Sequence, residues 1–112
     1  MAERRPRVGA VSASLLALAW VAGHAVSAES ATHTVTVENM RFDTDQLTVK
    51  RGDRVVWVNK DLFPHTVTAD GKAFDSGDIA AEKSWTYVAV TPGRYTYMCT
   101  YHPGMKATLI VQ

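Results

Sequence analysis

Near the C-terminus, a seven-residue stretch holds three side chains that bind soft metal ions, namely Cys99, His102 and Met105. Cys99 is the only cysteine of the chain, so it cannot form an internal disulfide bond. A thiolate, an imidazole and a thioether at such close spacing favour copper over other metals. His65, which lies 34 positions before Cys99, is the obvious candidate for a second imidazole ligand. The sequence therefore predicts a four-residue copper site.

This set of ligands favours electron transfer over hydrolysis. Two imidazoles and one thiolate form a trigonal plane around copper, and a thioether makes a long, weak bond on the axis. Such a site suits Cu(I) and Cu(II) about equally, so little has to move when an electron arrives. The segment from Cys99 to Met105 has no spare carboxylate, and four protein ligands leave no open position for a substrate.

Short alternating segments separated by turn residues predict the scaffold that must position these ligands. Beyond residues 1–28, no stretch shows sustained helical spacing. About eight short strands indicate an all-β fold, an antiparallel β-sandwich or barrel. In such a fold a loop at one end carries three of the ligands, and the folded sheets must bring His65 to them. Besides the segment 40–42, we expect strands over residues 32–38, 46–50, 54–59, 65–69, 83–90, 94–99 and 106–111.

The first 28 residues have the composition of an export signal. Three arginines precede an apolar segment over residues 8–26, and small residues at 26–28 permit cleavage after Ala28. The mature domain would then span residues 29–112. An uncleaved membrane anchor is the alternative, although the apolar segment is near the lower limit for spanning a bilayer. The paired arginines leave both Sec and twin-arginine export open.

The composition of residues 29–112 fits a small exported metal protein. These residues contain nine Lys and Arg against ten Asp and Glu, which gives a net charge of about −1. No large basic surface for nucleic acid follows from this balance. A domain of this size buries only roughly 60–65% of its unfolded surface, so a bound metal would add needed stability. In an oxidising compartment a free thiol is at risk unless it is ligated or buried.

The spacing Cys99-x-x-His102-x-x-Met105, together with the segments 55–59 and 63–67, resembles the cupredoxins, the small blue copper proteins. Within them it is most similar to the amicyanins and short plastocyanin-like proteins, over residues 34–111. The resemblance implies a Greek-key β-sandwich with one type 1 copper at the four candidate ligands, and a carrier rather than an enzyme. It also implies a periplasmic location and redox protein partners, such as a dehydrogenase donor and a cytochrome c acceptor.

The same resemblance suggests roles for neighbours of the site. It implies that Asn59 and Thr100 form a polar pair between the two ligand loops. The backbone N–H of Thr66 is a candidate donor to the Cys99 sulfur, and Tyr95 is expected to form a tyrosine corner. Tyr101, Gly104 and Thr66 depart from the amicyanins, which carry Pro, Phe and Asn there. We expect Trp57 and Trp85 in the core, Met40 and Met98 as packing residues, and His33 in solvent.

Two other functions compete with the electron carrier. A module that stores or delivers copper would have exchangeable, often Met-rich sites, whereas the methionines here are few and dispersed. A thiol enzyme would use Cys99 as nucleophile and His102 as base, but it needs a substrate cleft.

A further question concerns the residues that flank the ligands. They either form an apolar docking patch around a solvent-facing His102 or only shield the copper: Phe63, Pro64, Tyr101 and Pro103.

Overall fold

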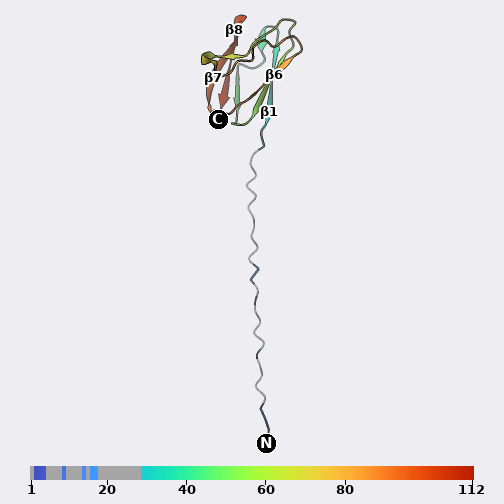
Figure 1. Cartoon of the computed structure of the whole chain (residues 1–112), viewed down its shortest axis with the longest axis vertical. Helices are drawn as coiled ribbons and strands as arrows, with labels where there is room; N and C mark the ends of the chain where they lie inside the picture. Colours follow the sequence, from blue (N-terminus) through green and yellow to red (C-terminus); the bar gives the residue numbers. More distant parts are fainter. Residues whose placement is uncertain (1, 5–8, 10–13, 15, 18–28) are drawn as a thin grey trace.

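Eight strands form the folded part of the chain (Figure 1). The computed structural model describes residues 2–4, 9, 14, 16–17 and 29–112. The predicted export signal falls mainly outside these residues and stays a prediction. Among the described residues, no helix has the length and apolar character needed to cross a bilayer. The strands are β1 Thr32–Glu38, β2 Arg41–Phe42, β3 Gln46–Val49, β4 Arg54–Asn59, β5 Thr68–Ala69, β6 Ser84–Val88, β7 Gly93–Cys99 and β8 His102–Val111, and a 3₁₀ turn, η1 Asp70–Lys72, follows β5.

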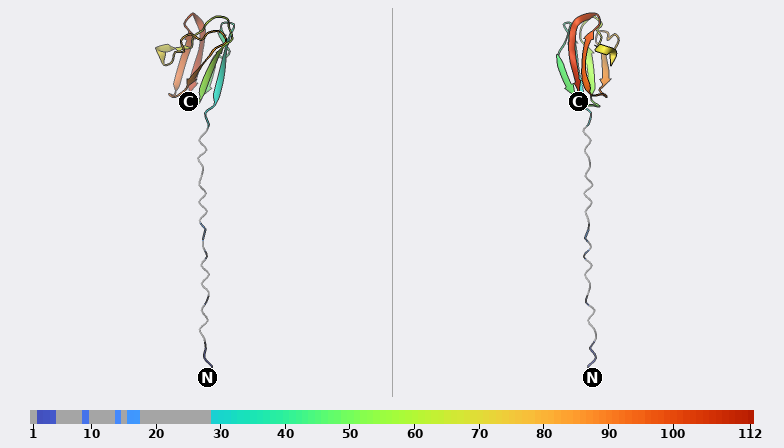
Figure 2. Two further views of the ribbon diagram at one scale, coloured as in Figure 1. Left: turned by 45° about the vertical axis from the view of Figure 1, so that its right-hand side comes forward. Right: turned by 90° about the vertical axis from the view of Figure 1, so that its left-hand side faces the viewer.

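The strands form two four-stranded sheets that pack face to face (Figure 2). One sheet has the order β2-β1-β4-β6 and the other β3-β8-β7-β5. The predicted all-β sandwich of eight strands is therefore confirmed. The pairing differs from the expected antiparallel pattern in two places, because β1 runs parallel to β4 and β3 runs parallel to β8. The chain crosses between sheets from β2 to β3 and back to β4, and such crossovers bring strands of the same direction together.

Alternation along the strands builds the core between the sheets. In β4, Val55, Trp57 and Asn59 are buried, while the residues between them are half-buried. Trp57 is fully buried and its ring lies 5.5 Å from that of Tyr97 and 5.6 Å from that of Trp85, between ring centroids. The expected core position of Trp57 is confirmed, and Trp85 packs against the core while partly exposed.

The start of β7 contains the expected tyrosine corner. The hydroxyl of Tyr95 donates a hydrogen bond of 2.8 Å to the backbone oxygen of Thr91, four residues earlier. The side chain then covers Gly93, where an added Cβ would lie 3.3 Å from both Cζ and the hydroxyl oxygen of Tyr95. A larger residue here would push against the Tyr95 side chain, so glycine suits the start of β7. This end of β7 lies opposite the end that carries Cys99, so the corner anchors the strand away from the ligand loop.

Asp53, in the turn before β4, fastens the beginning of β1. Its carboxylate accepts hydrogen bonds from the backbone N–H of Ala31 at 2.9 Å and of Lys50 at 3.0 Å. It also lies 3.0 Å from Nε2 of His33, and Asp53 is only 5% exposed. His33, which was expected in solvent rather than as a ligand, keeps 28% of its side chain exposed but also contacts this carboxylate, because parallel pairing of β1 with β4 places it there.

Removing this carboxylate is expected to change how stability depends on pH. The pKa of Asp53 is lowered to about 2, first by the hydrogen bond with His33 and then by those from Ala31 and Lys50. A lowered pKa in the folded state means that the ionised group stabilises the fold above pH 4, roughly the unfolded value, and that this contribution is lost between about pH 4 and 2. Urea unfolding of the copper-free protein should show this loss, and Asp53→Asn should lack it. If the unfolding free energies of the two proteins changed with pH in the same way, Asp53 would not be the group responsible.

Candidate metal centre

Three of the predicted ligands lie on one tight hairpin. Cys99 ends β7 and His102 begins β8, so only Thr100 and Tyr101 connect the strands. Cys99 pairs directly with His102, after an irregularity between Met98 and Cys99. The expected start of this last strand at residue 106 is therefore too late. A two-residue connection forces pairing to begin at once, and β8 then carries both His102 and Met105.

His65 lies in the segment between β4 and β5, and it reaches the hairpin from there. A short bridge holds it, in which its N–H donates to the oxygen of Ile79 at 3.1 Å and its oxygen accepts from the N–H of Ile79 at 2.7 Å. The expected strand over 65–69 is shorter than predicted, because only Thr68–Ala69 pairs with β7. Residues 65–69 are all buried and do not alternate, so this segment is a core loop rather than a half-exposed strand.

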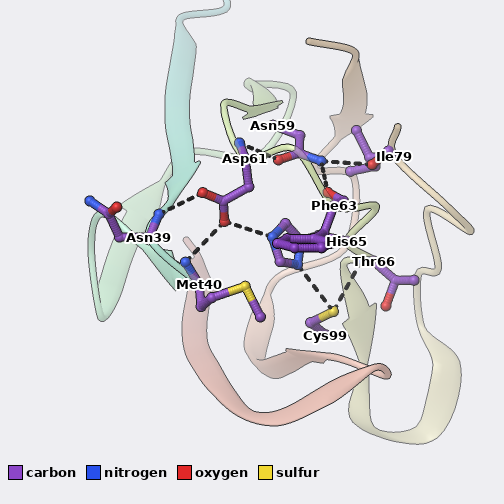
Figure 3. Close-up of polar contacts among 9 residues, drawn as sticks. All are labelled: Asn39, Met40, Asn59, Asp61, Phe63, His65, Thr66, Ile79 and Cys99. Atoms are coloured by element: carbon purple, nitrogen blue, oxygen red, sulfur yellow. Dashed lines mark hydrogen bonds and ion pairs between the residues drawn. The ribbon is translucent and has the colours of Figure 1, made fainter. Parts of the chain in front are cut away.

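The fold brings the four predicted ligands to one end of the sandwich. Nδ1 of His65 lies 3.7 Å from Sγ of Cys99 (Figure 3). The ring centroids of His65 and His102 are 5.7 Å apart, with an angle of 63° between the planes. His65 and Cys99 are fully buried, Met105 is 6% exposed and belongs to the same core cluster as Cys99, and His102 is half-buried.

The distance between the nitrogen and the sulfur fits a shared metal ion. Bonds of about 2.0 Å to an imidazole nitrogen and 2.3 Å to a thiolate, at an angle near 120°, place the two ligand atoms about 3.7 Å apart. The observed separation from His65 Nδ1 to Cys99 Sγ is 3.7 Å. Soft sulfur and imidazole donors in this set suit copper. The residues present therefore fit the metal that the sequence predicts.

Thr66 joins the two ligand segments through its backbone and its hydroxyl. Its N–H donates to the sulfur of Cys99 at 3.4 Å, which confirms the expected contact. Its Oγ1 accepts a hydrogen bond of 2.9 Å from the N–H of Thr100 and lies 3.2 Å from Oγ1 of Thr100. The sulfur and the hairpin connection are thus held by the residue that follows His65.

The expected pair between Asn59 and Thr100 is wrong. Both hydrogens of the fully buried Asn59 amide are used elsewhere, in hydrogen bonds to the backbone oxygens of Phe63 at 2.7 Å and Ile79 at 2.9 Å. Its oxygen accepts from the N–H of Asp61 at 2.9 Å. Asn59 therefore shapes the loop that ends at His65, and Thr66 takes the linking role through the contacts of its hydroxyl with Thr100.

Asp61 is a residue of the site that sequence reasoning missed. Its Oδ2 lies 2.8 Å from Nε2 of His65 and accepts from the N–H of Met40 at 2.9 Å, and its Oδ1 accepts from the N–H of Asn39 at 2.7 Å (Figure 3). Burial opposes ionisation, but the hydrogen bonds from Met40, His65 and Asn39 outweigh it and lower the pKa of this carboxyl. The available sequence signal was a carboxylate four positions before His65, a predicted ligand.

Exposed apolar residues flank the predicted ligands His65 and His102 in the sequence, and we call this set the apolar rim. Its most exposed members are Leu62 at 87%, Phe63 at 63% and Tyr101 at 52%. Leu62 was not among the residues expected from the sequence. The hydroxyl of Tyr101 donates to Asp78 at 2.5 Å, which ties the hairpin to the segment that bridges to His65. The rim consists of Leu62, Phe63, Pro64, Tyr101 and Pro103, all exposed.

Comparisons with known proteins point to one family. A family model described as a cupredoxin-like domain matches residues 11–111. Amicyanin from Paracoccus versutus is 31% identical over 83 residues, which cover 70% of this chain and 63% of that protein. Plastocyanin from a Synechococcus strain is 36% identical over 85 residues, which cover 62% of each chain. The matched segment spans slightly less than two thirds of these two relatives.

Solved structures give the same result for the fold. A methionine-to-alanine variant of amicyanin in its Cu(I) form has a TM-score of 0.68 and 29% identity, and the match covers 72% of this chain and 82% of that chain. An oxidised proline-to-alanine variant of amicyanin has a TM-score of 0.68 and 30% identity, with the same coverage.

Proposed function

Since the chain belongs to the cupredoxin-like family, we propose that it binds one copper ion and carries single electrons between redox proteins. The observation that carries this proposal is the 3.7 Å separation between His65 Nδ1 and Cys99 Sγ, two atoms from residues 34 positions apart. Copper, when bound, supplies a one-electron couple between Cu(I) and Cu(II). The proposed ligands are His65, Cys99, His102 and Met105.

The surrounding residues support this use of the site. The N–H of Thr66 donates to the Cys99 sulfur, which stabilises negative charge on the thiolate. Full burial of Cys99 and His65 keeps water from the site. His102 is the least buried of the four proposed ligands, so a redox partner can approach the site closely only there.

Burial of the ligands also separates the carrier from its competitors. A protein that stores or delivers copper needs ligands that exchange metal with solvent or a partner, whereas Cys99 and His65 are fully buried. A nucleophilic thiol must reach its substrate, and a fully buried Cys99 cannot. The amicyanin and plastocyanin relatives agree with a carrier rather than an enzyme.

The proposed function is tested by a spectroelectrochemical titration of the copper-loaded protein. We expect one copper per chain, an intense visible band in the oxidised form, and its reversible loss on uptake of one electron. A protein that binds copper but stays colourless, or that takes up electrons irreversibly, would reject the proposal.

The apolar rim is the surface where we propose that partners dock. All of its members are exposed, which favours docking over mere shielding of the copper, and small interfaces suit carriers that bind and release quickly. Phe63→Ser is expected to weaken electron transfer to a cytochrome c about tenfold, the effect of one interface anchor. Stopped-flow kinetics measure it, with Val90→Ser as control. Val90 is equally exposed at 60% but lies beside the tyrosine corner, at the other end of β7.

We further propose that residues 29–112 are the mature protein and that it acts in the periplasm. The support is the composition of residues 1–28 and the start of β1 at Thr32, shortly after the predicted cleavage position. The mass of the protein recovered from the periplasm of expressing bacteria tests both statements. A mass that includes residues 1–28 would favour the uncleaved anchor.

A further inference from the structure

We propose that Asp61 is a positioning residue, which orients His65 for the metal and lowers the reduction potential of the copper site. This inference rests on the proposed function, because it needs copper at His65. The key arrangement is a pair of contacts made by the two nitrogens of one imidazole ring, that of His65 (Figure 3). Oδ2 of Asp61 lies 2.8 Å from Nε2, and Sγ of Cys99 lies 3.7 Å from Nδ1.

The contact with Asp61 determines which ring nitrogen of His65 carries the proton. Both carboxylate oxygens already accept backbone N–H groups, Oδ1 from Asn39 and Oδ2 from Met40. The carboxylate therefore acts only as an acceptor, so the proton between it and the ring belongs to Nε2. Nδ1 then keeps a free lone pair, and this lone pair faces the Cys99 sulfur where the metal would bind.

The carboxylate is itself held in place by a distant part of the chain. Asn39 and Met40 form the turn between β1 and β2 and have φ angles of 55° and 59°. This left-handed pair directs two successive N–H groups at Asp61, at 2.7 and 2.9 Å. The backbone N–H of Asp61 is bound to Asn59 in addition. With its side chain 13% exposed, Asp61 has little freedom to move, so it holds the ring of His65 in one orientation.

A carboxylate behind a ligand imidazole also affects the two oxidation states differently. It increases electron donation from Nδ1, which stabilises the more highly charged Cu(II) more than Cu(I). His65 is fully buried, and solvent therefore screens this effect weakly. The reduction potential is lower as a result. Replacing the carboxylate by a neutral amide of the same shape should raise the potential.

The chain contains a matched control for this experiment. Asp53 accepts two backbone N–H groups and lies 3.0 Å from Nε2 of a histidine, as Asp61 does at 2.8 Å. Its histidine, His33, is not among the proposed ligands. Asp53→Asn therefore removes the same charge and the same kind of hydrogen bonds without touching the metal site.

We expect Asp61→Asn to weaken Cu(II) binding about tenfold relative to Cu(I), at the lower end of the range for groups that support metal ligands. For one electron this raises the reduction potential by about 59 mV. Asp53→Asn should leave the potential unchanged. Protein-film voltammetry of the two variants and the wild type, with urea unfolding of each, separates this effect from a loss of stability.

The outcomes distinguish the inference from the proposed function. A colourless wild-type copper complex rejects the function. A blue wild type with an unchanged potential in Asp61→Asn, or an equal shift in both variants, overturns only the role of Asp61. Long-range ¹H–¹⁵N NMR of the copper-free wild type gives a test that needs no variant to fold. We expect the proton of His65 on Nε2, and a proton on Nδ1 would also overturn the inference.

Discussion

Replacing Cys99 with serine is expected to abolish the intense visible absorption of the copper-loaded protein. Cys99 supplies the only thiolate of the chain, and a soft thiolate is what distinguishes a blue copper site from one with nitrogen and oxygen ligands. A serine hydroxyl is a hard, protonated donor at neutral pH. Loss of a ligand should weaken copper binding at least as much as loss of a supporting group, by about 100-fold or more.

Absorption spectra and competitive copper titrations measure both effects. Serine differs from cysteine by one atom, and the fully buried position between Thr66 and the hairpin should retain its fold. Met98→Leu is the control, because Met98 precedes Cys99 in β7 but is not a proposed ligand, and a swap of similar volume is well tolerated. An intensely blue Cys99→Ser protein would show that the metal binds elsewhere.

Replacing Trp57 with alanine is expected to cost about 3–5 kcal/mol of unfolding free energy. The side chain is fully buried in the centre of β4. Its ring lies against Phe74, Trp85 and Tyr97, and its N–H donates to the Tyr97 hydroxyl at 3.3 Å. A domain of this size has a total stability of roughly 4–13 kcal/mol. The loss is therefore a large share of the total, and the copper-free variant comes close to unfolding only if the wild type lies at the lower end of this range.

Urea unfolding of the copper-free wild type and of Trp57→Ala, followed by circular dichroism, gives the difference in unfolding free energy. Leu62→Ala serves as control, since Leu62 is 87% exposed and surface substitutions usually change stability by less than about 0.5 kcal/mol. Copper should shift the midpoint of both proteins upward, because a ligand that binds only the folded state stabilises it. A loss below about 1 kcal/mol for Trp57→Ala would mean that the aromatic core does not depend on this ring.

Much of the fold follows from local patterns. The bounds of β1 and β4 were predicted correctly, because their buried residues alternate with a period of two and turn residues bound them. The start of β8 and the segment 65–69 were predicted less well. At His102 the two-residue connection of the hairpin, rather than the strand preference of the residues, decides where β8 begins. Residues 65–69 are all buried, so no alternation marks where strand pairing begins there.

The sequence by itself determined the identity of the proposed ligands, since Cys99, His102 and Met105 lie on one hairpin whose spacing is local. It also indicated that His65 would join them. Only the tertiary structure decided how these side chains are held. The linking of Thr66 to Thr100, 34 positions apart, and of Asp61 to the turn at Asn39, 22 positions apart, depends on sheets that meet after folding. No local pattern records such contacts, because hydrogen bonds between distant segments arise from packing rather than from residue order.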